Sequence, residues 1–435
     1  MRRRALIVVS SYRPAMLADM QRARALAWQL PALGWDVEIL TPAPSEVRPD
    51  AIEPDATGFF ANDTPVHEVR AWLSPLFRLF TSRTGSWRMA LPIFWRGRGL
   101  LASGRFDLVY FTTTAFILVA CASSWQRRFS VPYVIDFQDP WLLPVDRYRG
   151  RGWKARLSAW IDRHLEKKAV RKAAGLIAVS DAYVATLKLR YHKLVPRWLE
   201  ESRHAVIPFA ADERDLIEAA GRGRSVAAAK GGELALHYVG AGPTMQRSFA
   251  LVCRALARLR SSGDALAGRV RIRLFGTGTP GQHDGKPVLK HLADTAGIGD
   301  LVEERPQRVS YRRSLELILE SDGLLVLGVD DVGYVPSKLF GYALSGKPLL
   351  ASLRRDGAAY AMVQSTPSLG RSLWFEQTET MPLDEAASLF GEFLQEMAAG
   401  RTFDRRPLLQ THLAPAMAQR HVALFQACVA GGPSS

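Results

Sequence analysis

Short apolar runs alternate with amphipathic segments along most of the chain. Residues 5–9 form one such run, a polar loop follows at residues 10–14, residues 17–33 have helical periodicity, and residues 37–40 are again apolar. Continuous apolar runs are typical of strands that are buried on both faces of a parallel sheet. The start of the chain therefore predicts the strand, helix and strand that open a doubly wound sheet.

The alternation occurs twice, on either side of a segment rich in glycine and alanine. Further strands are predicted at residues 107–111, 131–136, 175–179 and 205–208, and then at residues 234–239, 270–275, 301–303, 323–329 and 349–351. Residues 221–232 have the composition of a linker. We therefore expect an α/β fold with two doubly wound Rossmann-like domains facing a cleft, at residues 1–220 and 233–385. Residues 386–435 are expected to form terminal helices, the last of which is free to cross back to the first domain.

Residues 333–352 contain the strongest candidate binding element. Pro336 stands where a helix tolerates proline in its first turn, apolar residues then recur at helical spacing, and Gly346 ends the helix. Because the strand at 323–329 ends just before it, the helix start with Ser337 and Lys338 is expected at the carboxyl edge of the sheet. Free N–H groups, the helix dipole and an ammonium favour an anion there, and phosphate is the natural guest.

Two further loops at the carboxyl ends of predicted strands contain paired glycines. Glycine lets a backbone approach a ligand closely because it has no Cβ. The glycines are Gly240, Gly242, Gly276 and Gly278. Together with Arg247 and the helix start at 336–338, these loops predict a diphosphate cradle. The loop at 10–14 lacks the G-x-G-x-x-G pattern, so tightly held NAD or FAD is not expected.

The charge of the chain is uneven. The formal net charge is +15, and residues 1–200 carry 30 Lys and Arg against 17 Asp and Glu. A basic first half favours phosphate-rich partners, either nucleic acid or an anionic membrane surface. Residues 67–98 interleave aromatic residues with arginines, and residues 153–174 predict a basic amphipathic helix whose charges either face solvent or contact a membrane.

Residues 67–98 allow three interpretations. As an interfacial helix, the segment would place apolar side chains among lipid headgroups and arginines on anionic lipid. Alternatively, the aromatics fill the core of the first domain and the arginines line its edge. Single-stranded nucleic acid is a third partner for arginines beside aromatics. No nucleic-acid module signature accompanies the segment, so no nucleic-acid partner is expected.

Cysteines, histidines and apolar run lengths restrict the class further. Cys121, Cys253 and Cys428 have neither paired nor metal-ligand spacing, which predicts buried thiols in a reduced compartment. The histidines at 283, 291, 412 and 421 share no ligand spacing, so we expect them at the surface and expect no metal site. The apolar start is too short for a signal peptide, and no apolar run approaches a membrane span. A cytoplasmic protein is expected.

Four motifs, taken in their order along the chain, resemble the sequence pattern of a known protein family. They are VIDFQDPW at 134–141, HYVG at 237–240, LFGTG at 274–278 and VPSKLFGYALSGKPLLA at 335–351. Together they resemble a GT-B fold glycosyltransferase of the glycosyltransferase family 4 type. The resemblance implies retaining transfer from a nucleotide-diphospho-sugar that is held mainly by the second domain, without a metal or another cofactor.

The resemblance also assigns roles to residues of this sequence. Expected catalytic residues are Lys338, Arg247, Gln138 and Asp139. Expected nucleotide-sugar-binding residues are Gly240, Gly242, Gly276, Gly278, Asp331, Tyr334, Pro336, Ser337 and Leu339. Expected acceptor-side residues are Ser11, Arg13 and Asp136. Asp136 and Asp139 also stand at the carboxyl end of a predicted strand, where loops of α/β sheets build their sites.

The sequence departs from the family pattern at two positions. Relatives often carry two glutamates eight positions apart that bind the sugar and the ribose, where this chain has Gly333 and Gly341. Asp330 or Asp331 can replace the first acid after a small loop shift. The two glycines therefore leave the nucleoside of the donor undetermined between uridine and guanosine.

The expected function is sugar transfer to a glycan or lipid-linked acceptor in cell-surface polysaccharide biosynthesis. The enzyme is expected to be peripheral on the inner face of the membrane, because the basic first half would hold the acceptor. One alternative is a catalytically degenerate GT-B subunit that binds the donor or acts as a scaffold. A sugar-nucleotide epimerase, which shares the two-sheet architecture, is another.

Overall fold

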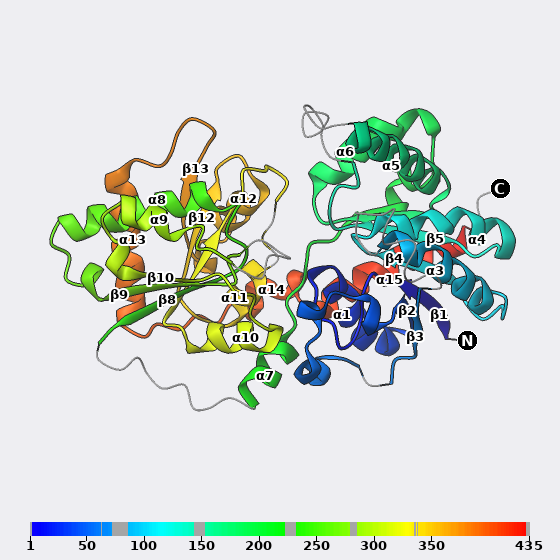
Figure 1. Ribbon diagram of the computed structural model, residues 1–435, viewed down its shortest axis with the longest axis horizontal. Coiled ribbons are helices and arrows are strands. Elements are labelled where there is room, and N and C mark those ends of the chain that lie inside the picture. Colours follow the sequence, from blue (N-terminus) through cyan, green and yellow to red (C-terminus); the bar gives the residue numbers. More distant parts are fainter. Residues whose placement is uncertain are drawn as a thin grey trace. The chain divides into compact units, whose positions relative to one another are not determined.

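The structure is a computed structural model. It describes residues 2–61, 63–71, 86–142, 153–221, 232–278, 285–334, 336 and 338–431. The chain forms two compact units. One unit contains Met1–Phe209 together with Ala414–Ser435, and the other contains Ala210–Leu413. Figure 1 shows that each unit is built around a sheet with helices packed about it.

The first unit contains a seven-stranded parallel sheet in the order β3-β2-β1-β4-β5-β6-β7. The strands are β1 Arg3–Val8, β2 Trp35–Pro42, β3 Val66–Val69, β4 Leu108–Thr112, β5 Tyr133–Phe137, β6 Gly175–Ala178 and β7 His204–Val206. The helices are α1 Gln21–Gln29, α3 Ser86–Leu101, α4 Ala122–Phe129, α5 Trp153–Lys172, α6 Asp181–Tyr191 and α15 Ala414–Ala430. The strand order reverses between β1 and β4, and such a switch point is where ligands bind in doubly wound sheets.

The second unit contains a six-stranded parallel sheet in the order β10-β9-β8-β11-β12-β13. The strands are β8 Leu234–Val239, β9 Val270–Phe275, β10 Val302–Arg305, β11 Gly323–Leu327, β12 Leu349–Arg354 and β13 Arg371–Phe375. The helices are α7 Glu213–Gly221, α8 Gln246–Ser261, α9 Lys290–Thr295, α10 Tyr311–Glu320, α11 Lys338–Leu344, α12 Ala358–Ser365, α13 Leu383–Ala398 and α14 Arg406–Leu409. Here the order reverses between β8 and β11, so the loops that follow these two strands meet at the switch point.

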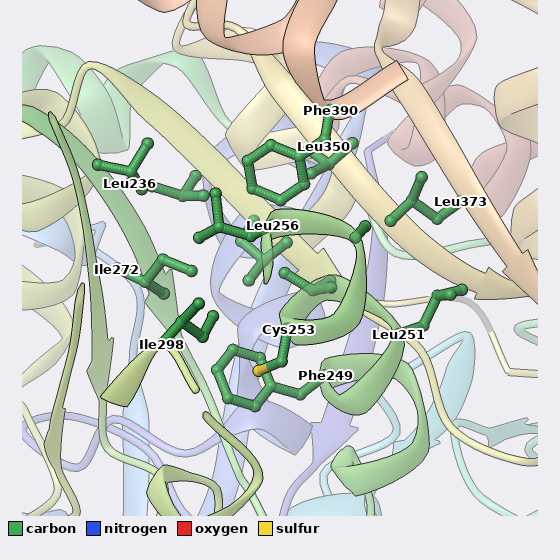
Figure 2. Close-up of a cluster of buried hydrophobic side chains, with 14 of the residues drawn as sticks. Leu236, Phe249, Leu251, Cys253, Leu256, Ile272, Ile298, Leu350, Leu373 and Phe390 are labelled. Atoms are coloured by element: carbon green, nitrogen blue, oxygen red, sulfur yellow. The ribbon is translucent and has the colours of Figure 1, made fainter. Parts of the chain in front are cut away.

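Helix α8 shows how the second unit forms its core. Its buried side chains include Phe249, Val252, Cys253 and Leu256, a helical spacing that places them on one face. Figure 2 shows this face against side chains of the sheet and against Phe390 of α13. Each large apolar side chain that is fully buried contributes about 1.5–3 kcal/mol. This packing fixes the end of β8 and the loop that leads into α8.

The last helix belongs to the first unit. The ring of Phe425 in α15 lies 5.6 Å from that of Trp35 in β2 and 5.2 Å from that of Tyr110 in β4. Of the expected terminal helices, α13 and α14 lie in the second unit, whereas α15, the helix that was free to cross back, lies in the first.

The expected boundary at residue 220 is too late. The first unit ends at Phe209, and α7 belongs to the second unit. The reason is polar pairing with α10: Tyr311 donates a hydrogen bond of 2.6 Å to Asp215, and Arg312 pairs with Glu218 at 3.0 Å. Of the expected linker at 221–232, residues 222–231 lie outside the described residues.

The predicted strands are present, and the sheets contain two strands that were not predicted, β3 and β13. Between β4 and β5, a 3-10 turn at Phe116–Cys121 precedes α4. Cys121, Cys253 and Cys428 are buried and free, as predicted.

Candidate functional site

Helix α11 stands at the carboxyl edge of the second sheet, as predicted. It begins at Lys338 after the buried Pro336, and the chain turns at Gly346, whose φ of +76° belongs to the left-handed region. Val335 and Ser337 lie outside the described residues, so the role expected for Ser337 stays a prediction.

The ammonium of Lys338 is directed at the end of β8. Lys338 as a whole is exposed, but its Nζ donates a hydrogen bond to the carbonyl oxygen of Val239. Tyr342, one turn further along α11, accepts a 3.0 Å hydrogen bond from the Val239 N–H and donates one of 3.2 Å to the Val239 carbonyl. Helix α11 and strand β8 are thus joined where the candidate ligand loops begin.

Lys338 has no carboxylate ion-pair partner within the described part of the chain. Burial of its amine and the positive charge of Arg308 lower the pKa of Lys338 to about 8. A cation that has lost water and gained no counter-ion is stabilised by an arriving anion. This end of α11 therefore favours a negatively charged group.

Gly240 is the glycine that faces this ammonium. A Cβ at residue 240 would lie 3.0 Å from Nζ of Lys338 and 2.7 Å from the hydroxyl of Tyr238. Contacts that short force the neighbouring groups to move, so a side chain at 240 would displace the cation. Glycine at this position keeps the ammonium beside bare backbone.

The other three glycines are required by packing within the unit. A Cβ at Gly242 would lie 2.7 Å from the carbonyl oxygen of Thr277, and one at Gly278 would lie 2.7 Å from that of Pro306. Gly276 has a φ of +71°. In all four glycines, Gly240 included, the N–H donates to a carbonyl oxygen of the protein at 2.9 Å. These amides are therefore already used and do not form a phosphate cradle.

A residue that the sequence analysis did not identify holds the second glycine loop. Glu304 in β10 accepts a 2.5 Å hydrogen bond from Thr277, and its two oxygens accept from the N–H groups of Val288, Leu289 and Lys290 at 2.7–2.9 Å. A carboxylate of the protein thus occupies the amino end of α9, the place where an external anion would otherwise bind. No local motif signals this role, because Glu304 is distant in sequence from the groups that it accepts from.

Arg247, the second predicted cation, lies in an exposed ion-pair cluster. Its guanidinium is 3.1 Å from Asp330, which also lies 2.9 Å from Arg354. Exposed pairs of this kind are worth about 0–1 kcal/mol, so Arg247 can exchange its carboxylate for a ligand phosphate at little cost. Asp331 instead shapes the loop, because its carboxylate accepts from the N–H of Gly333 at 2.8 Å.

The remaining residues that were predicted to bind the donor differ in how deeply they are buried. Tyr334 is half-buried and packs against the core of the second unit. Leu339 is completely buried, so its side chain lies in the core, and the contact expected between Leu339 and the nucleotide-sugar stays a prediction. Gly341, in contrast, has open space: a Cβ there would meet nothing within 4 Å.

The residues that were expected to contact the acceptor lie in the first unit. Their side chains are buried or bonded to the protein. Ser11 is fully buried, and Arg13 donates to the carbonyl oxygens of Ala61 and Thr64 at 3.3 and 3.4 Å, which anchors the loop after β1. The carboxylate of Asp136 is buried and paired with the protein, so the prediction that it contacts an acceptor is wrong.

The loop after β5 brings two predicted residues toward the edge of the sheet. Gln138 is buried, and its Nε2 donates to the carbonyl oxygen of Asp19 at 2.9 Å. Asp139 is exposed in the same loop. Desolvation and the nearby charge of Asp19 raise the pKa of Asp139, which makes its carboxylate more basic than an ordinary aspartate.

No group of three His, Cys, Asp or Glu residues within the described part of the chain is arranged to hold a metal ion. None of the described helices combines the length and the apolar character that a membrane span needs. The expectation that all four histidines lie at the surface is wrong for His421, which is completely buried.

Comparisons with known proteins agree with the fold and, over the first half of the chain, with the family resemblance. Residues 20–198 match the sequence model of the glycosyl transferase 4-like domain. The fold resembles Anabaena HepE in complex with UDP-glucose, with a TM-score of 0.60 and 15% identity over 98% of this chain and 99% of that one. It also resembles α,α-trehalose 6-phosphate synthase from Burkholderia multivorans, with a TM-score of 0.57 and 13% identity over 99% of each chain. No curated protein sequence matches. The resemblance to GT-B fold, family 4 type glycosyltransferases is confirmed, as is the two-sheet α/β fold.

Proposed function

We propose that this chain, a GT-B fold protein resembling glycosyltransferase family 4, transfers a sugar from a nucleotide-diphospho-sugar. One observation carries the proposal: the ammonium of Lys338 stands beside the bare backbone of Gly240 without a carboxylate partner in the described residues. A diphosphate supplies the missing negative charge. The matching glycosyl transferase 4-like domain supports the reaction class.

The proposed chemistry requires charge stabilisation more than covalent catalysis. The bond between the anomeric carbon and the diphosphate oxygen breaks, and the charge that develops on the diphosphate is stabilised by Lys338 and Arg247. The acceptor oxygen attacks from the same face, so the configuration is retained, and a leaving phosphate oxygen takes its proton. Gln138 and Asp139 are the first unit's proposed contacts to the sugar and the acceptor. The proposed reaction uses neither a metal nor another cofactor.

A UDP-sugar is the donor to test first. HepE, whose fold this chain shares, has been solved with UDP-glucose and with UDP and glucose. Gly341 leaves open space beside α11, and we propose that the nucleoside approaches the helix there.

The acceptor is proposed to be a glycan or lipid-linked molecule at an anionic membrane surface, used in cell-surface polysaccharide synthesis. Helix α3 supports this, because Trp87, Leu91 and Trp95 follow one another at four-residue spacing and are 36%, 60% and 46% exposed. Arg96 and Arg98 are exposed beside them. Tryptophan and arginine on one helix surface suit a headgroup layer. Peripheral attachment at the inner face of the membrane follows from this proposal.

Helix α3 also contains the buried side chains that the core interpretation of residues 67–98 requires. Met89 and Ile93 of α3 are buried in the core of the first unit, while the opposite stripe is exposed. Residues 72–85, which carry part of the aromatic and basic pattern, lie outside the described residues.

A degenerate donor-binding subunit is the second candidate. It is favoured by Gly333 and Gly341, which stand where relatives carry acids. Two measurements distinguish the enzyme from the subunit. One is the release of nucleoside diphosphate from a panel of UDP- and GDP-sugars, and the other is the binding of the same donors, measured by calorimetry. Release from one donor supports the enzyme, whereas tight binding without release supports the subunit.

The decisive variant is Lys338→Ala. Loss of one preorganised donor to the developing charge is expected to slow turnover about 10²- to 10³-fold. Lys290→Ala is the matched control, because this lysine pairs with Asp294 at 3.2 Å, on a helix start that Glu304 already caps. Equal turnover in the two variants would reject the assignment of Lys338.

A further inference from the structure

The first unit contains a buried polar network that the proposed chemistry does not use. At its centre, Oδ2 of Asp136 lies 3.2 Å from Nε of Arg22, and both side chains are 0% exposed. The same oxygen accepts hydrogen bonds from Tyr110 at 3.0 Å and Thr112 at 2.7 Å. Because desolvation offsets most of the attraction within a buried ion pair, stability alone is a weak reason for such a cluster.

The C-terminal helix contributes to this network. Nε2 of His421 in α15 lies 3.5 Å from Nη1 of Arg22 and 3.1 Å from the hydroxyl of Tyr110. Nδ1 of His421 faces the carbonyl oxygen of Met417 at 2.7 Å, so the proton resides on Nδ1 and Nε2 is the acceptor. Burial and the charge of Arg22 keep the pKa of His421 well below its ordinary value, which favours this neutral form.

Arg22 is held from other directions as well. Its Nη2 donates a 2.7 Å hydrogen bond to the carbonyl oxygen of Ile207, just after β7, and its guanidinium lies 5.5 Å from the ring centre of Phe209. Elements from both ends of the first unit's sequence therefore fix one guanidinium, and the guanidinium fixes Asp136.

Gln138 connects the network to the edge of the sheet. Its Nε2 lies 2.9 Å from the carbonyl oxygen of Asp19, 2.7 Å from Oγ1 of Thr112 and 3.3 Å from Oδ2 of Asp136. A carbonyl and an ionised carboxylate can only accept, so the amide must turn its nitrogen inward. None of the hydrogen bonds of Gln138 within the described residues uses Oε1.

We propose that Arg22, Tyr110 and His421 are positioning residues for Gln138. By holding Asp136, they direct Oε1 of Gln138 outward as a hydrogen-bond acceptor for a hydroxyl group of the substrate sugar. The C-terminal helix is thereby part of the construction of the site. The role of Oε1 rests on the proposed sugar transfer, whereas the orientation of the amide does not.

The kinetic test compares two buried tyrosines. Tyr110→Phe removes the hydroxyl that donates to Asp136 and lies 3.1 Å from Nε2 of His421, and Tyr133→Phe removes a hydroxyl that donates a 2.5 Å hydrogen bond to the carbonyl oxygen of Ala169 in the same core. Both variants are expected to lower the urea midpoint. Tyr110→Phe alone is expected to lower kcat about tenfold, about 1.4 kcal/mol in activation free energy, with KM for the donor changed less than about twofold. Equal kcat values in the two variants would overturn the positioning role.

A second measurement does not depend on activity. The side-chain NH₂ signals of Gln138 are assigned by their loss in Gln138→Leu, and their exchange with solvent is followed by NMR in the full chain. Slow exchange in the wild type that accelerates at least about tenfold in Tyr110→Phe is expected for an inward nitrogen. Fast exchange in the wild type would overturn the inference. Slow exchange with no turnover of any donor would leave the orientation intact and count against the proposed function.

Discussion

Lys338 donates a hydrogen bond from Nζ to the carbonyl oxygen of Val239, the last residue of β8. This contact holds a cation at the switch point of the second sheet, where the loops after β8 and β11 begin. Because a single carbonyl is a weak partner for an ammonium, the arrangement remains receptive to a stronger one.

Donor binding is expected to weaken above about pH 8. The pKa of Lys338 is lowered to about 8, so raising the pH through this value removes the charge that attracts the diphosphate. Calorimetric titration of a UDP-sugar from pH 6.5 to 9.5 measures the effect. A Kd that stays constant across this range would contradict it.

Stability without donor is expected to change in the opposite direction. The folded-state pKa lies below the ordinary value of 10.5, so between about pH 8 and 10.5 the unfolded chain binds more protons than the folded one. The contribution of Lys338 to the free energy of unfolding therefore rises with pH across this window. Urea denaturation of the wild type and of Lys338→Met isolates the contribution, because the uncharged variant lacks it. A difference between the two proteins that is independent of pH would count against the lowered pKa.

Two glycine substitutions are expected to have opposite effects. Gly240→Ala places a methyl group 2.7 Å from the hydroxyl of Tyr238 and 3.0 Å from Nζ of Lys338, so donor binding and stability both fall. Gly341→Ala adds a methyl group that meets nothing within 4 Å in the interior of α11, so it stabilises the protein by about 0.5–1 kcal/mol. Thermal unfolding with and without a UDP-sugar measures both effects. Stabilisation by Gly240→Ala would show that the ammonium does not stand where the structure places it.

The sheets could be predicted from the sequence because their strands are continuous apolar runs. β9, Val270–Phe275, was predicted with both of its ends, and α11 followed from Pro336 and Gly346. Burial of single polar residues could not be predicted. Nothing near His421 in the sequence indicates that it is buried beside Arg22, since tertiary packing alone brings the two together. The same applies to Glu304, whose partners lie on another element.

The exposed stripe of α3 is expected to carry membrane binding. Leu91→Ser should lower partitioning onto anionic vesicles about five- to tenfold, because it removes an apolar side chain of 60% exposure from the proposed lipid contact. Ile217→Ser on α7 of the second unit removes a side chain of 68% exposure and is expected to change nothing. Sedimentation with phosphatidylglycerol and with neutral vesicles measures partitioning, and added salt should weaken the anionic case. Equal losses in both variants would indicate unspecific adsorption.

Substitutions in the buried pair of Arg22 and Asp136 are expected to lower the free energy of unfolding more than substitutions in exposed ion pairs. Asp136→Asn leaves a guanidinium without its counter-ion in a site that is 0% exposed, and breaking a buried pair in this way costs about 3–5 kcal/mol. Asp300→Asn is the control, because its 2.8 Å pair with Arg260 is exposed and solvent screening leaves such pairs little effect on stability. Urea denaturation measures both.

The double variant Arg22→Met with Asp136→Leu extends this test. It removes both charges and retains apolar volume, so it is expected to cost less than the sum of the two single substitutions. Because the apolar pair cannot orient Gln138, the double variant should remain folded while losing the slow exchange of the Gln138 amide. Additive losses of stability would show that Arg22 and Asp136 contribute independently, and an unchanged amide would show that Gln138 is held by Asp19 and Thr112 alone.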